Sequence, residues 1–102
     1  MTEQDIQRKI IKYLESIGAY VVKVVASNKS GTPDIIACYR GIFLAIEVKR
    51  PETKTNVSEL QIYNIKKIKD AGGVAIVSWD LDTVKATIEE INFNLMVIGG
   101  LK

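Results

Sequence analysis

Residues 31–50 read Gly-Thr-Pro-Asp-Ile-Ile-Ala-Cys-Tyr-Arg-Gly-Ile-Phe-Leu-Ala-Ile-Glu-Val-Lys-Arg, and this stretch decides the fold that the sequence predicts. It contains two runs rich in apolar and β-branched residues, 34–39 and 42–49, which have the length and composition of β-strands. Between the two runs, Arg40 and Gly41 suit a tight turn. The stretch therefore predicts a β-hairpin.

Charged side chains interrupt the apolar pattern at one end of this hairpin. Successive side chains of a strand point to opposite faces, so Glu47 and Lys49 share one face while Val48 points to the other. The remaining residues on the Val48 face are apolar: Ile42, Leu44 and Ile46. Asp34 begins the neighbouring strand, so we expect a second carboxylate one strand away from Glu47.

The segments around the hairpin predict further strands and helices. Residues 2–18 and 58–71 carry apolar side chains at helical spacing, each between an N-capping residue and a glycine. Residues 19–26 and 74–78 are short valine-containing runs typical of strands. Asp80 begins a last helix, whose apolar stripe consists of Leu81, Val84, Ile88 and Ile91.

The order of these elements predicts an α/β fold, in which a mixed central β-sheet is flanked by helices. A helix between strands 42–49 and 74–78 makes a β-α-β unit, which implies a parallel strand pair with a right-handed crossover. The complete order is α-β-β-β-α-β followed by a C-terminal helix. Residues 93–98 are mostly apolar, and two interpretations stay open for them, an extra strand or a dimer contact.

The composition limits what the chain can be. Its 102 residues suit one domain, 1–102, and a net charge of +2 permits nucleic-acid binding without requiring it. The chain has no histidine, which excludes His-based triads and His-dependent zinc sites. The single cysteine, Cys38, allows no internal disulfide and favours a reducing compartment, and we expect it to be a buried strand residue. No apolar run has the length of a membrane span, so we expect no membrane partner.

Several motifs occur in an order that resembles the PD-(D/E)XK nucleases, and in particular their VRR-NUC branch. They are Gly31-x-Pro33-Asp34, Glu47-x-Lys49, Ser58-x-x-Gln61 and Gly72-Gly73 before the last apolar strand. The resemblance covers roughly residues 3 to 79. It implies a restriction-endonuclease-like fold, which agrees with the order of elements above, and the hydrolysis of DNA phosphodiester bonds.

The charged residues of the hairpin suit metal-assisted hydrolysis. Mg²⁺ prefers oxygen ligands and takes one or two carboxylates in many sites, which Asp34 and Glu47 could supply. The resemblance adds the Val48 carbonyl as a further ligand, and Mn²⁺ would substitute for Mg²⁺. Lys49 could hold the attacking water or stabilise charge that grows on the phosphate. The alternative for Glu47 and Lys49 is a surface salt bridge.

Two further residues have both a functional and a structural interpretation. Gln61 would lie on the helix stripe that faces the sheet, where its amide could contact Lys49, a metal-bound water or the phosphate. It could equally close a capping box with Ser58, and both roles can hold together. Glu3 resembles the first-helix glutamate of the family, which could reach the metal through water, but it could also be an acid favoured by the helix dipole, and Asp5 competes for the same role.

Positively charged and polar side chains near these carboxylates are candidates for phosphate contacts without base readout. The candidates are Lys23, Lys29, Ser30, Arg50 and Lys54. Lys29 and Lys54 stand out because both lie in loops that flank the carboxylates. Three more lysines on the 58–71 helix, Lys66, Lys67 and Lys69, fit a solvated helix face better.

The sequence therefore predicts a divalent-metal-dependent endonuclease that acts on branched DNA such as Holliday junctions. The resemblance further implies a phage or bacterial enzyme, cytoplasmic and homodimeric, since two symmetric cuts need two sites. Two alternatives remain. The chain could be a sequence-specific restriction-type nuclease, or a non-catalytic DNA-binding subunit that keeps the fold.

Overall fold

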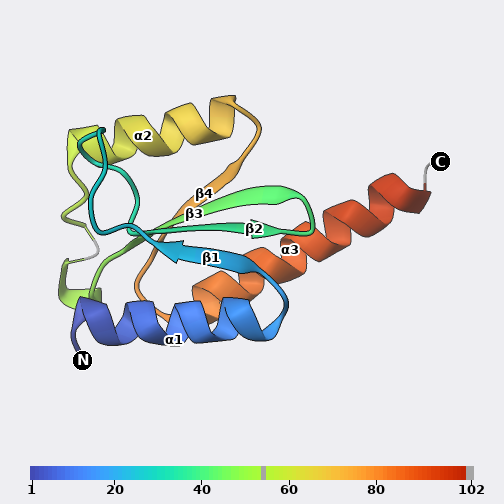
Figure 1. The fold of residues 1–102 in the computed structure, drawn as a ribbon, viewed down its shortest axis with the longest axis horizontal. Coiled ribbons are helices and arrows are strands. Elements are labelled where there is room, and N and C mark those ends of the chain that lie inside the picture. Colours follow the sequence, from blue (N-terminus) through green and yellow to red (C-terminus); the bar gives the residue numbers. More distant parts are fainter. Residues whose placement is uncertain (54, 101–102) are drawn as a thin grey trace.

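The computed structural model describes residues 1–53 and 55–100, which form one four-stranded sheet with helices on both faces (Figure 1). The elements in chain order are α1 (Glu3–Ser16), β1 (Tyr20–Lys23), β2 (Ile35–Tyr39), β3 (Ile42–Val48), a short 3-10 turn η1 (Pro51–Thr53), α2 (Glu59–Asp70), β4 (Val74–Ser78) and α3 (Leu81–Gly100). The predicted α/β architecture with a C-terminal helix is confirmed.

The strands lie in the order β1-β2-β3-β4, so their spatial order follows the chain. β1–β2 and β2–β3 are antiparallel, and β3–β4 is the predicted parallel pair. Arg40 and Gly41 form the hairpin turn, with φ angles of 51° and 81°. Two positive φ angles in succession match a type I′ turn, whose twist suits a two-residue hairpin. β3 is hydrogen-bonded on both sides and is a central strand.

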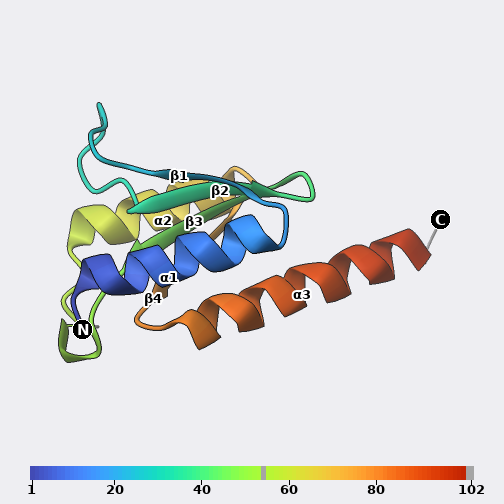
Figure 2. The ribbon, with the colours of Figure 1, turned by 60° about the horizontal axis from the view of Figure 1, so that its bottom comes forward.

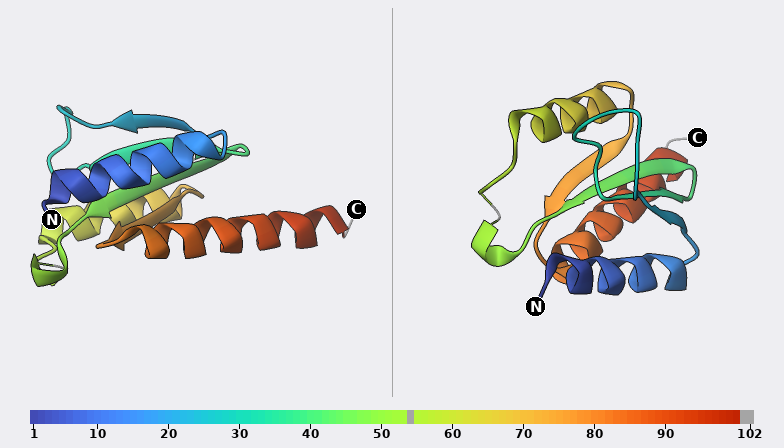
Figure 3. Two further views of the ribbon diagram at one scale, coloured as in Figure 1. Left: turned by 90° about the horizontal axis from the view of Figure 1, so that it is seen from below. Right: turned by 60° about the vertical axis from the view of Figure 1, so that its left-hand side comes forward.

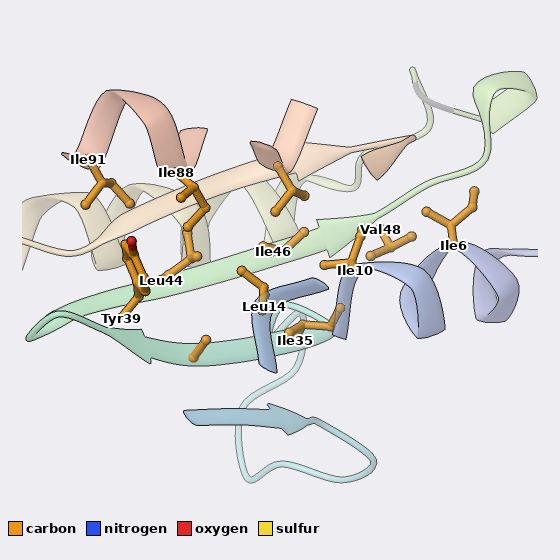
Figure 4. Packing of buried hydrophobic residues seen from close by; sticks show 12 residues of the cluster. Ile6, Ile10, Leu14, Ile35, Tyr39, Leu44, Ile46, Val48, Ile88 and Ile91 are labelled. Carbon is orange, nitrogen blue, oxygen red and sulfur yellow. The ribbon is translucent and has the colours of Figure 1, made fainter. Parts of the chain in front are cut away.

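The core lies between the sheet and the two helices α1 and α3 (Figures 2 and 4). The alternation predicted for the hairpin holds here, because Leu44, Ile46 and Val48 of β3 are all fully buried on this face. Other core residues come from α1, β2 and α3: Ile6, Ile10, Leu14, Ile35, Ala37, Tyr39, Val84, Ile88 and Ile91. Helix α1 begins at a capping box between Thr2 and Asp5.

Helix α2 covers the opposite face of the sheet, and none of its residues is buried. It begins at the predicted capping box, in which Gln61 N–H donates to Ser58 Oγ and Ser58 N–H donates to Gln61 Oε1. The loop before β2 packs against its first turn at Gly31, which has φ +79°. A Cβ at this glycine would lie 2.9 Å from the Leu60 carbonyl carbon, so the loop can approach the helix only without a side chain there.

Two predictions about strands are corrected. The first strand spans Tyr20–Lys23 instead of residues 19–26, because its ladder ends at the bond from Val24 N–H to the Asp34 carbonyl, and Pro33 has no N–H with which to continue it. Cys38, expected to be buried, is exposed on β2. It lies on the sheet face that carries α2, but α2 does not cover this part of β2.

The strand interpretation of residues 93–98 is also wrong, because these residues continue helix α3. Asn92 anchors the helix to the hairpin end, since its Oδ1 accepts hydrogen bonds from Tyr39 OH at 2.9 Å and Arg40 Nη1 at 2.8 Å. Beyond Asn92, α3 extends past the sheet (Figure 3). None of the helices in the described residues, α3 included, is long and apolar enough to cross a membrane.

The contact at Gly31 predicts that Gly31→Ala destabilises the protein more than Gly18→Ala. Both glycines have positive φ, at which alanine costs about 1–2 kcal/mol, but nothing lies within 4 Å of a Cβ at Gly18. Overpacking against α2 should add about 1–3 kcal/mol at Gly31. Urea unfolding of both variants measures the difference, and equal losses would contradict the close packing of this loop on α2.

Candidate active site

Asp34 and Glu47 lie opposite each other across the β2–β3 pair, at the end where β2 begins. Ile35 and Ile46 are register partners in this antiparallel pair, so positions 34 and 47 face each other one step further along. The backbone N–H of Val48 donates a hydrogen bond of 2.7 Å to Asp34 Oδ2. This bond fixes the Asp34 carboxylate beside β3.

The Glu47 carboxylate is buried and has two partners on one oxygen. Its residue is only 3% exposed. Gln61 Nε2 donates to Glu47 Oε2 at 3.0 Å, and Lys49 Nζ lies 3.8 Å from the same oxygen. Four predicted site residues, Asp34, Glu47, Lys49 and Gln61, thus converge on the face of the sheet that carries α2.

Gln61 has both of the roles that its sequence position allowed. Its Oε1 accepts from Ser58 N–H, as a capping glutamine does, and its Nε2 reaches Glu47. The amide is held at one end by the helix and donates at the other. It therefore fixes the Glu47 side chain in relation to α2.

The site holds excess negative charge. The pKa of the Glu47 carboxyl is raised to about 8. Burial is the largest cause, the Asp34 charge and a hydrogen bond with Asp34 act in the same direction, and the Lys49 charge lowers this pKa. A smaller contribution that raises this pKa comes from Glu3. One lysine thus does not compensate two neighbouring carboxylates, and a divalent cation would relieve their repulsion.

Glu3 lies close enough to belong to the surroundings of this site. Its Oε2 accepts a hydrogen bond of 3.4 Å from Thr53 Oγ1 in η1, and Thr53 Oγ1 also accepts from Arg50 N–H at 3.1 Å. The start of α1 and the segment after β3 are therefore joined beside the carboxylates. Asp5, the competitor of Glu3, instead closes the α1 capping box.

The residues present suit a hard divalent ion held by few protein ligands. Among residues 1–53 and 55–100, no group of three or more histidine, cysteine, aspartate or glutamate side chains converges as a metal cluster. Asp34 and Glu47 offer the one or two carboxylates that Mg²⁺ takes in many sites. Soft metals have no ligand set here, since the chain has no histidine and the exposed Cys38 is its one cysteine.

The predicted DNA-binding residues do not all lie on the same side of the sheet. Arg50 follows Lys49 directly and is exposed, and Lys29 and Ser30 lie in the loop that packs on α2. Lys23 pairs in register with the core residue Ile35, so its side chain leaves the sheet on the α1 face, away from Glu47. Lys54 lies outside the described residues.

Sequence reasoning missed Asn64 and the aromatic pair Phe43 and Tyr63. Asn64 Nδ2 donates to the Ser30 carbonyl at 2.9 Å and so ties the loop before Asp34 to α2. Its position three residues after Gln61, on the same side of the helix, was the available signal. Phe43 and Tyr63 line one groove although twenty positions separate them, and no local sequence pattern predicts that they lie together.

Comparison with known proteins identifies the family. The model of the archaeal Holliday junction resolvase (Hjc) family matches residues 3–97. The chain belongs to this family. The match covers most of the chain, including α1, the hairpin and most of α3.

Two solved structures are similar to this chain, and the first supports this assignment. A structure described as a VRR_NUC domain has a TM-score of 0.72 and 26% sequence identity, and the similarity covers 85% of this chain and 94% of that one. A second, the Holliday junction resolvase Hjc of Archaeoglobus fulgidus, has a TM-score of 0.48 and 20% identity over 72% of this chain and 64% of that one. No curated protein sequence matches significantly.

These findings confirm the resemblance to the PD-(D/E)XK nucleases and their restriction-endonuclease-like fold. As a member of the Hjc family, the chain is a structure-selective nuclease of the Holliday junction class, and dependence on divalent metal is general for the fold. The phage or bacterial origin implied by the resemblance stays a prediction, since the matching family model is archaeal.

The Glu47 environment predicts that the metal-free protein loses stability as the pH rises from about 4.5 to about 8. The folded state keeps the Glu47 proton that the unfolded state releases near 4.5, so unfolding becomes easier through this window. The loss would reach roughly 5 kcal/mol, since one pKa unit corresponds to about 1.4 kcal/mol. Urea unfolding in EDTA measures it. The Glu47→Gln variant should show a much flatter profile, and parallel profiles would contradict the assignment.

Proposed function

We propose that residues 1–102 form a single nuclease domain that cuts branched DNA with Mg²⁺, which Mn²⁺ can replace, and that acts as a homodimer. The observation that carries the proposal is the convergence of Asp34, Glu47, Lys49 and Gln61 on one side of the sheet. The raised pKa of Glu47 supports a cation at this place, because burial first and the Asp34 charge second disfavour the ionised carboxylate, and a bound cation would favour it.

Asp34 and Glu47 would hold the metal through carboxylate oxygens. The Val48 carbonyl is the third candidate ligand, and Glu3 could reach the ion through water. A bound divalent ion supplies positive charge at the scissile phosphate and lowers the pKa of a coordinated water. The hydrogen bond from Val48 N–H keeps Asp34 oriented, so the two carboxylates need little rearrangement on binding.

Lys49 and Gln61 would act beside the carboxylates. The Lys49 ammonium lies on the Glu47 side of β3, where it can orient the attacking water or donate to the charge that develops on the phosphate. Gln61 is a positioning residue, because its amide contacts Glu47 and holds that carboxylate in one orientation. The two side chains come from β3 and α2, so the site requires both elements.

The DNA backbone would pass over the exposed basic side chains around this site. Arg50, Lys29 and the Ser30 loop lie on the exposed surface of the described residues, and Lys54 belongs to the same proposal by its sequence position. Contacts to phosphates position DNA without reading its sequence. A DNA substrate and the lack of a possible internal disulfide both support action in the cytoplasm.

The first test measures cleavage of labelled four-way junction, flap and linear duplex by the wild type and by Asp34→Asn, Glu47→Gln and Lys49→Ala. The wild type should cut the junction fastest, and each substitution should lower the single-turnover rate about 10²–10⁴-fold. Gln61→Ala should lower it about 10–100-fold, as the loss of a group that orients a ligand does.

Glu52→Gln is the matched control, since Glu52 is an exposed acid a few residues beyond β3. It should cut at the wild-type rate. Junction cleavage at unchanged rate by Lys49→Ala and Asp34→Asn, both shown to be folded by circular dichroism, would refute the assignment of the site.

The second test measures Mn²⁺ binding by calorimetry without DNA. Wild type should bind the ion and release protons on binding at pH 7, because Glu47 is partly protonated in the metal-free protein. Asp34→Asn and Glu47→Gln should each lose most of the affinity. Binding of Mn²⁺ that both variants retain would place the ion elsewhere.

A further inference from the structure

Helix α1 contains a buried polar residue, Gln7, with an unpaired atom. The residue is only 8% exposed, although its neighbours in the helix–sheet interface are apolar. Its amide oxygen, Oε1, is buried and accepts no hydrogen bond from any group in residues 1–53 and 55–100. A buried acceptor without a donor destabilises the folded protein, and native proteins keep few of them. A donor that binds beside Gln7 would therefore be stabilised there.

Gln7 shares one side of α1 with Glu3. Four residues of this helix follow each other at intervals of four, three and four positions: Glu3, Gln7, Ile10 and Leu14. Such spacing places them in a single stripe. Ile10 and Leu14 are fully buried, so the stripe faces the sheet. Glu3 and Gln7 form its polar end, one helical turn apart, with about 5–6 Å between their Cβ atoms.

The side chain of Gln7 extends toward the end of α1 that is nearest the candidate site. In a helix each Cα–Cβ bond tilts toward the N-terminus, and a long side chain covers the turn before its own residue. For Gln7 that turn begins at Glu3. Glu3 is joined to η1 by the hydrogen bond from Thr53 Oγ1, and the start of α1 lies beside η1 (Figure 1). Its charge also acts on the Glu47 carboxyl.

A water bound to a divalent ion has the donors that suit these two residues. Such a water turns a lone pair of its oxygen to the ion, which leaves two O–H groups to donate, and Mg²⁺ in proteins usually keeps several waters. The Glu3 carboxylate can accept from one O–H group and Gln7 Oε1 from the other. With O–H···O distances of about 2.7–2.8 Å, one water joins two acceptors roughly 4.5 Å apart. Side chains one helical turn apart can provide that separation.

Lys23 is the competing donor within the chain. Its side chain leaves the sheet on the face that carries α1. However, Lys23 is exposed, and a compact ammonium group in solvent is strongly hydrated, so it gains little by turning to a buried amide oxygen. A water held between the ion and α1 has no such alternative. The ion-bound water is therefore the donor that fits Gln7 better.

We propose that Gln7 is a positioning residue of the metal site, and that its Oε1 accepts a hydrogen bond from the ion-bound water that also donates to Glu3. This inference rests on the proposed function and deepens it. The two acceptors fix the orientation of the water and hold the ion on the α1 side of the carboxylates. An amide suits this place because it accepts a hydrogen bond without adding another negative charge near Asp34 and Glu47.

Calorimetry of Mn²⁺ binding without DNA tests the proposal. Gln7→Met removes the acceptor and should weaken binding about 10–100-fold, as the loss of a group that orients a metal ligand does. Gln7→Glu keeps an acceptor oxygen in either protonation state and should stay within about threefold of the wild type. Gln4→Met is the matched control, since Gln4 is exposed on the same helix, and it should bind Mn²⁺ as the wild type does.

Urea unfolding separates this role from a purely structural one. In EDTA, Gln7→Met should leave the urea midpoint unchanged or raise it, because an unpaired buried acceptor is removed. In Mn²⁺ its midpoint should rise less than that of the wild type, because ion binding stabilises it less. A glutamine that bonds to Lys23 would give the reverse. A lower midpoint in EDTA, or an unchanged Mn²⁺ affinity, would overturn the proposal.

A double substitution tests whether Glu3 and Gln7 act on the same water. Glu3→Met alone should also weaken Mn²⁺ binding, and adding Gln7→Met should cost little more, because residues that share a partner are not additive. Losses that multiply would overturn the shared water. Asp34→Asn separates the two levels of the argument. Mn²⁺ binding that Asp34→Asn loses but Gln7→Met keeps would overturn this inference alone, whereas binding that Asp34→Asn keeps would refute the proposed metal site itself.

Discussion

The structure depends on one electrostatic constraint, the placement of two carboxylates side by side at the edge of a hydrophobic core. Glu47 belongs to a central strand and is buried, and Asp34 faces it from the next strand. In the absence of a cation this arrangement is unfavourable, as the raised pKa of Glu47 indicates. The surrounding fold must hold both groups in place against their repulsion, and most of the features described above serve this purpose.

The two faces of the sheet hold these carboxylates in place in different ways. On one face, α1 and α3 bury the apolar side chains of β3, which gives the hairpin its stability. On the other face, α2 has no fully buried residue but contributes polar contacts: Gln61 to Glu47, and Asn64 to the Ser30 carbonyl. The apolar packing and the polar contacts of the candidate site thus come from different helices, although both act through the same strand.

The hairpin and its charged end could be predicted because strand alternation and a two-residue turn fix which side chains share a face. Val48 in the core and Glu47 on the α2 side follow from period two alone, and the register that opposes Asp34 to Glu47 follows from the turn at Arg40 and Gly41. The exposure of Cys38 could not be predicted in this way, since it depends on how far α2 extends over the sheet. The strand interpretation of residues 93–98 was wrong for a related reason, because the periodicity of a short apolar run does not distinguish a helix from a strand. The fold and the family are established.

The absence of buried residues in α2 has a consequence for how the molecule opens. A segment with few apolar anchors belongs to the least stable cooperative unit of a protein and opens well before global unfolding. Amide exchange would then be fast along this helix and slow along β3, and a brief detachment of α2 would release the glutamate while the sheet stays intact. The geometry of the candidate site therefore depends on α2 staying in place, and any macromolecule that holds α2 against the sheet would raise the fraction of molecules in which this geometry is intact.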